Sequence, residues 1–178
     1  MSKKFESFSE AEAQAIVAGD IERQLPHSVR EVLLDVILAW ANLEMATGFF
    51  VASVLGINPD EGAERFGRKE IADKLKRAAN ALRNSGKFEV ASKISEISRV
   101  YPEMTLFRRR IAHSKCAGVR KSVPSRVVFL PFEREGEPGN LAVEVIEISK
   151  FSEAVSWAND VHKYLMQHVD GSDFFGAQ

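Results

Sequence analysis

The residues whose types and spacing could do chemistry lie in one stretch, LFRRRIAHSKC, from Leu106 to Cys116. Three consecutive arginines precede a single histidine, and four residues lie between Arg108 and His113. An imidazole exchanges a proton near neutral pH, and a guanidinium binds phosphate through paired donors without losing its charge. Metal-free cleavage of RNA requires these two capacities, and DNA should resist because it lacks the 2′-hydroxyl nucleophile.

This stretch lies in the one concentrated basic segment of the sequence, residues 99 to 126. The segment holds eight basic residues and one acid, Glu103, so it carries +7 while the whole chain carries −1 and the remainder −8. The eight are Arg99, Arg108, Arg109, Arg110, Lys115, Arg120, Lys121 and Arg126. This asymmetry predicts a local positive potential that attracts a phosphodiester. The alternative interpretation is a solvated face that nearby carboxylates balance.

A helix from Met104 to about Cys116 is expected to carry the motif. On such a helix Arg109 lies one turn before His113, and Arg110 lies three residues before it. The apolar residues of the opposite side are Met104, Phe107 and Ile111. We therefore interpret His113 and Arg108 as catalytic. Arg109, Arg110 and Lys115 are interpreted as phosphate-binding or supporting residues. The structural alternative is a helix C-terminus where His113 and Lys115 face the negative end of the helix dipole.

The motif also resembles that of a known superfamily. RRRIAHS is similar to the Arg-Asn-x-Ile-Ala-His-Ser stretch of the HEPN superfamily, whose signature is an arginine, four to six residues and a histidine. The segment AWANLEMATGFF is similar to a long helix of such proteins that carries Trp-x-x-Leu-Glu, and the resemblance spans Val29 to Ser114. It implies a helical bundle, a homodimer and metal-independent endoribonuclease activity. It also implies a toxin–antitoxin or phage-defence setting, with an antitoxin protein as partner.

Two positions of this chain differ from the usual HEPN pattern. Arg108 matches the motif arginine and His113 its histidine, but Arg109 stands where the superfamily usually has asparagine or another small polar residue. Lys115 stands where some toxins carry a tyrosine that their antitoxin modifies. Members without nuclease activity exist, so the second hypothesis is a non-catalytic HEPN-like module that binds RNA, a nucleotide or a protein. A third hypothesis is a small regulatory protein without an anionic ligand.

Glu44 is the remaining candidate for the site. It lies in the most apolar segment of the chain, residues 28 to 55, and a buried carboxylate is costly unless a cation pairs with it. We expect Glu44 to pair with an arginine of the run 108–110 and to orient that arginine. A purely structural ion pair is the alternative. Trp40 of the same segment is expected in the core rather than as a base-stacking surface.

The sequence contains no motif typical of nucleotide-triphosphate, zinc or α/β-hydrolase chemistry. It lacks a glycine-rich phosphate loop, a His-Glu-x-x-His pair, paired cysteines and a Gly-x-Ser-x-Gly elbow, so we expect no metal and no cofactor. Cys116 is the single cysteine, which suits a reducing cytoplasm. The first residues, MSKKFESFSE, have no apolar run and do not indicate a secretory signal. The sequence therefore predicts a cytoplasmic protein.

The elements that position the motif are predicted to form a single HEPN-like, mainly α domain over residues 1–178. It comprises a helical bundle from about 9 to 116, a β-hairpin from about 126 to 148 and a final helix from about 150 to 169. The bundle helices are predicted at Ser9–Leu25, Ser28–Leu55, Asn58–Phe66, Ile71–Asn84, Phe88–Val100 and Met104–Cys116. Pro102 is expected to separate the last two.

The longest predicted helix, Ser28–Leu55, is apolar around most of its circumference. This pattern favours a central helix or one that forms a dimer. We expect no membrane span, because polar residues interrupt its apolar windows. These residues are Arg30, Glu31, Asp35, Asn42 and Glu44.

Overall fold

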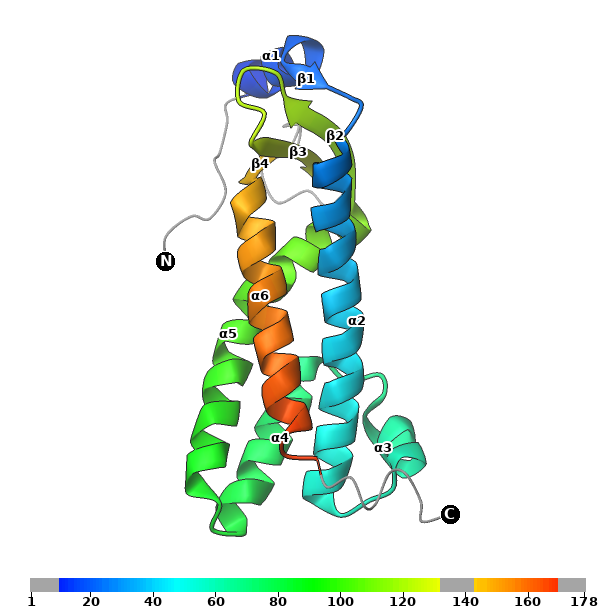
Figure 1. Cartoon of the computed structure of the whole chain (residues 1–178), viewed down its shortest axis with the longest axis vertical. Coiled ribbons are helices and arrows are strands. Elements are labelled where there is room, and N and C mark those ends of the chain that lie inside the picture. The colour runs from blue at the N-terminus through cyan, green and yellow to red at the C-terminus, as the bar shows by residue number, and fades with distance from the viewer. Residues whose placement is uncertain (1–9, 132–142, 170–178) are drawn as a thin grey trace. The chain divides into compact units, whose positions relative to one another are not determined.

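The computed structural model describes residues 10–131 and 143–169, and within them the chain is mainly α, as predicted (Figure 1). Six helices and a four-stranded antiparallel sheet are formed by these residues. They divide into two compact units. Residues 10–37, 106–131 and 143–155 make up the sheet unit, and residues 38–105 and 156–169 make up the helical unit. The expectation of a single domain stays a prediction.

The sheet unit contains four strands in the order β1-β2-β3-β4. They are β1 (Ile21–Glu22), β2 (Ser114–Arg120), β3 (Arg126–Pro131) and β4 (Glu144–Glu147). β3 and β4 pair antiparallel, with Val127 opposite Ile146, which confirms the predicted hairpin. The predicted strand residues Phe132, Leu141 and Ala142 lie outside the described residues.

Apolar side chains cover both faces of this sheet. On one face, Ala13 and Ile16 of α1 (Glu10–Gly19) pack against Val128 and Val145. Because successive strand residues point to opposite faces, Phe129 lies on the other face. There Phe151 of α6 (Ile148–Met166) lies 5.9 Å from Phe129 and 5.6 Å from Phe107 of α5 (Phe88–His113), measured between ring centroids. The sheet is therefore the centre of this unit's core.

The helical unit is held together by aromatic and aliphatic packing between parts of its helices. Trp40 of α2 (His27–Leu55) is 1% exposed, and its ring centroid lies 6.2 Å from that of Trp157. The ring centroid of Tyr101 lies 6.4 Å from that of Trp157. The prediction that Trp40 belongs to the core is confirmed. The unit is completed by α3 (Pro59–Phe66), which the Asn58 side chain caps, and by α4 (Ile71–Asn84).

The prediction that Pro102 separates two helices is wrong, since α5 continues through it. Proline lacks the N–H that would bond to the carbonyl of Ser98, which costs a helix interior about 3 kcal/mol. Here Pro102 lies on the exposed side, while Tyr101 and Thr105 beside it are 5% and 3% exposed. Burial of these flanking side chains offsets the lost bond, because packing contributes more to a helix than propensity does.

The strands β1 and β2 are absent from the sequence predictions, and both shorten a predicted helix. The first helix ends at Gly19 instead of Leu25, and the helix that carries the motif ends at His113 instead of Cys116. Gly118 explains part of this difference. Its φ is 138°, a Cβ there would overlap the Glu22 carbonyl oxygen, and the β2–β3 register shifts between Cys116 and Gly118. A bulge that only glycine tolerates therefore lets β1 lie against β2.

One helix, α2, is long and apolar enough to cross a membrane when length and composition alone are considered. Of the polar residues expected to interrupt its apolar windows, Asn42 and Glu44 fall in the window from Val36 to Leu55. The core helix of a globular protein passes the same test, and Val36, Trp40 and Leu43 are buried. The absence of a membrane span stays a prediction.

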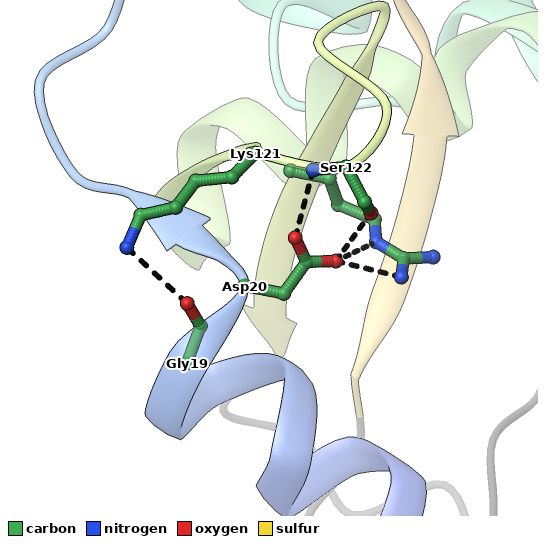
Figure 2. A network of polar contacts seen from close by, with 5 residues as sticks. Gly19, Asp20, Lys121 and Ser122 are labelled. Atoms are coloured by element: carbon green, nitrogen blue, oxygen red, sulfur yellow. Dashed lines mark hydrogen bonds and ion pairs between the residues drawn. The ribbon is translucent and has the colours of Figure 1, made fainter.

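A polar network around Asp20 fastens the end of α1 to the end of β2 (Figure 2). The Asp20 carboxylate accepts hydrogen bonds from the backbone N–H of Ser122 at 2.8 Å and from its hydroxyl at 2.6 Å. The Arg120 guanidinium contacts the same carboxylate at 2.7 Å, and Lys121 donates to the Gly19 carbonyl at 3.2 Å. The hydrogen bonds from Ser122 and then from Arg120 lower the pKa of Asp20 from 3.8 to about 2.

We predict that Asp20→Asn destabilises the protein at neutral pH but much less in acid. The folded-state pKa of Asp20 lies below its unfolded value, so its contribution to stability is complete above about pH 4 and is lost as the pH falls toward 2. Thermal unfolding at several pH values measures this. The difference in Tm between wild type and Asp20→Asn should narrow from pH 6 to pH 2.5.

Asp73→Asn is the control for this prediction, because the Asp73 carboxylate pairs with Lys76 on the surface of α4. Its Tm difference from wild type should be small throughout. A gap for Asp20→Asn that stays constant across this pH range would contradict the assigned role of the network.

Candidate functional site

His113 is the last residue of α5, and its side chain is exposed. The next residue, Ser114, begins β2 and pairs with Pro131 of β3. His113 therefore lies where a helix passes directly into a sheet, with no loop between them. Within the described part of the chain, the His113 side chain makes no hydrogen bond or ion pair. The negative end of the α5 dipole favours a cation at this position.

The arginine run, Arg108 to Arg110, lies in the last two turns of the same helix. Arg109 is exposed one turn before His113, and Arg108 is half-buried. Lys115 is exposed on β2, two residues beyond the histidine. Five of the six predicted site residues, Arg108, Arg109, Arg110, His113 and Lys115, thus lie within a stretch of eight residues in the sheet unit.

Arg110 pairs with a carboxylate of the sheet unit. Its Nε lies 2.5 Å from Oε2 of Glu144 on β4, and the two side chains are 13% and 15% exposed. A pair so far removed from water depends on both members, because one charge left alone would be uncompensated. Glu144 is therefore a structural partner of Arg110. Phosphate binding by Arg110 stays a prediction.

Two further cations of the basic segment are paired in the same way. Arg120 contacts Asp20, and Arg126 contacts Glu147 at 2.5 Å. The hydrogen bond from Arg126 lowers the pKa of Glu147, so this carboxylate stays charged at neutral pH. The +7 segment is therefore partly neutralised by acids from distant parts of the chain. The exposed cations next to His113 are Arg109 and Lys115, and Arg108 lies beside them.

Glu44 is exposed, which corrects the premise that an apolar helix would bury its carboxylate. Apolar residues surround α2 in sequence, but only part of its surface is covered, so a charge on the uncovered part stays in water. Glu44 acts electrostatically on Lys74 of α4. Burial lowers the pKa of Lys74, while the negative charges of Glu44 and Glu70 favour its charged form. The expected pairing with the arginine run stays a prediction, because Glu44 and the run belong to different units.

Cys116 lies within the motif stretch but does not have the surroundings of a nucleophile. It is half-buried on β2, and burial raises the pKa of its thiol. The thiol is therefore largely protonated at neutral pH, whereas nucleophilic cysteines act as thiolates. Within residues 10–131 and 143–169, His, Cys, Asp and Glu side chains form no group of three that could hold a metal ion.

Glu144 is the residue of this region that the sequence predictions missed. A signal for it exists, because Glu144 alternates with Val143 and Val145 on a predicted strand and therefore faces away from them. That face is shared with Phe129, its neighbour in the register of β3 and β4. The sequence alone does not reveal that the last turn of α5 brings Arg110 to the same face.

Comparisons of this chain with models of protein families, with curated proteins and with solved structures found no match. The resemblance to the HEPN superfamily therefore stays a prediction from the motif.

The pairing of cations leads to a prediction about binding to single-stranded RNA. Lys115→Gln and Arg108→Gln should weaken binding and lower the slope of log K against log salt concentration by roughly 1 each, the contribution of one phosphate contact. Fluorescence anisotropy over a salt series at 4 °C, with RNA that carries a 2′-O-methyl group at every position to prevent cleavage, measures this slope.

Arg126→Gln is the matched control, because Glu147 already neutralises this guanidinium. It should leave both the affinity and the slope close to those of wild type. An equal loss in all three variants would mean that the whole basic segment contributes and that the carboxylate partners are irrelevant.

Proposed function

We propose that this protein is a metal-independent endoribonuclease of the HEPN type that acts at His113. The observation that carries the proposal is an exposed histidine at the end of a packed helix, flanked by Arg108, Arg109 and Lys115. A proton carrier needs access to solvent and substrate, and phosphate needs fixed positive charge beside it. The exposure of His113 and the neighbouring cations of the sheet unit support the proposal on both counts.

The proposed reaction is transfer of the phosphoryl group within RNA. The 2′-oxygen attacks phosphorus and the bond to the 5′-oxygen breaks, which yields a 2′,3′-cyclic phosphate and a free 5′-hydroxyl. His113 accepts the proton of the 2′-hydroxyl, and the 5′-oxygen takes up one proton from the imidazolium or from water. Arg108, helped by Arg109, stabilises the negative charge that grows on the phosphate oxygens.

A second candidate function is a non-catalytic module that binds RNA, a nucleotide or a protein through the same basic surface. The observation in its favour is Arg109, which stands where the HEPN pattern usually has asparagine. A guanidinium there adds charge for binding but changes the hydrogen bonds available to orient the histidine. Binding and cleavage assays with the same RNA separate the two functions.

We also propose that the protein forms a homodimer through α2. Large exposed apolar residues gather on this helix: Leu34, Leu38 and Met45 are 57%, 52% and 52% exposed. Their spacings of four and seven residues place them along one stripe, as in helices that pair with another helix. An aligned stripe of this kind differs from the scattered apolar residues that are normal on a surface. An antitoxin partner is proposed from the HEPN resemblance, and a cytoplasmic location is proposed from the single cysteine, Cys116, and the lack of an apolar run in the first residues.

The direct test of the enzymatic proposal uses purified protein and single-stranded RNA in excess EDTA. Wild type should cleave the RNA and leave cyclic phosphate ends, and His113→Ala should be slower by at least about 10²-fold, the usual contribution of a general acid or base. Mass spectrometry of the products identifies the ends. An all-DNA strand of the same sequence should stay intact.

His27→Ala is the matched control, because His27 is also an exposed histidine of the sheet unit and pairs with Glu31. It should retain wild-type cleavage. RNA binding without any cleavage by wild type would support the binding module instead, and cleavage that survives in His113→Ala would rule out His113 as the proton carrier.

The dimer proposal predicts that Leu38→Ser with Met45→Ser produces a monomer. Both side chains are exposed within one chain, so the double variant should keep its fold by circular dichroism. Light scattering after size-exclusion chromatography gives the mass. Phe88→Ser is the control, since Phe88 is 68% exposed but lies at the start of α5, and it should stay dimeric. A wild-type protein that is monomeric at high concentration would refute the proposal.

A further inference from the structure

We propose that Glu144 is a positioning residue that acts on His113 through Arg110. The consequence of this inference for catalysis rests on the proposed function, but its structural part does not. Glu144 lies on β4, more than thirty residues after the motif, and is no part of the Arg-x4-His signature. The proposed role of Glu144 does not involve contact with substrate.

The inference begins with the environment of the ion pair. Arg110 Nε and Glu144 Oε2 lie 2.5 Å apart, and these two atoms are buried from solvent. Removing one member of a buried ion pair is costly, because the remaining charge is left uncompensated away from water. Arg110 lies three residues before His113, so both occupy the last turn of α5 and point to neighbouring parts of its surface.

The strands after His113 connect it to Glu144 through backbone pairing. Ser114 follows His113 and pairs with Pro131 of β3, while Phe129 of the same strand pairs with Glu144. Glu144 on β4 then contacts Arg110, so the sheet is linked back to the last turn of α5. The last turn of a helix normally frays, because its carbonyl groups lack partners within the helix. Here that turn is held by two links to the sheet: the ion pair of Arg110 with Glu144, and the backbone of β2, which begins at Ser114.

His113 needs such an external support because it has no polar partner of its own in the described part of the chain. Many catalytic histidines are oriented by a group on their second ring nitrogen. In this protein the orientation of the ring depends on the backbone of the last turn. We infer that the Arg110–Glu144 pair performs this task indirectly.

Glu144 also determines how much positive charge the site presents. It carries a negative charge beside Arg110, so replacing it with glutamine removes one negative charge from the neighbourhood of the phosphate-binding residues. A residue that only stabilised the fold would lower binding and turnover together. Glu144→Gln should instead lower kcat while KM stays equal or falls, because binding gains a charge when the histidine loses its fixed position.

The test that does not depend on RNA cleavage is amide hydrogen exchange. In Glu144→Gln, exchange at Ile111, Ala112 and His113 should be at least about tenfold faster than in wild type, because the last turn opens locally. The matched control is Glu147→Gln on the same strand, which loses the pair with Arg126 and leaves α5 untouched. Its exchange rates at residues 111–113 should equal those of wild type.

Glu144→Asp keeps the charge but shortens the side chain, and it serves if Glu144→Gln does not fold. Its exchange rates should lie between those of wild type and Glu144→Gln, and it should restore part of kcat. Equal exchange at residues 111–113 in wild type and in the folded Glu144 variants would overturn the inference. Absence of RNA cleavage by wild type would instead refute the proposed function, and the exchange data would still decide whether Glu144 positions the helix end.

Discussion

The ion pair between Arg110 and Glu144 is the interaction on which the geometry of the candidate site depends. It joins the end of α5 to β4, and the two strands between them connect the same points through backbone pairing. A helix end that would otherwise fray is thereby fixed at the position of His113. Since charges so far from water are costly to leave unpaired, the contact also ensures that α5 and β4 meet in one arrangement.

The basic segment serves two purposes that its composition does not distinguish. Arg110, Arg120 and Arg126 each pair with an acid from another element and thereby hold the sheet unit together. Arg109 and Lys115 are exposed near His113, with Arg108 half-buried beside them. The alternative of a face balanced by carboxylates therefore describes part of the segment, and the localised positive potential stays a prediction. The exposed cations of the segment, Arg109 and Lys115, lie next to the residue that could transfer a proton.

Periodicity alone predicts most of the helices and the β3–β4 hairpin, because long amphipathic patterns and alternating strands leave clear signals. It fails at α5, where burial of Tyr101 and Thr105 lets the helix continue through Pro102. It also misses β1 and β2, because a two-residue strand and a bulge at Gly118 depend on tertiary contacts. The motif residues are visible in the sequence, but the partner of Arg110 is not, since Glu144 becomes its neighbour only after the sheet has formed.

The central claim is that the exposed imidazole of His113 carries the proton during cleavage of RNA without metal. The most direct measurement is the pH dependence of the cleavage rate in EDTA, compared with the titration of the His113 ring protons followed by NMR in the same buffer. We predict that an inflection in the rate coincides with the His113 titration and is absent in His113→Ala. A rate that ignores this titration, or that requires an added divalent cation, would contradict the account.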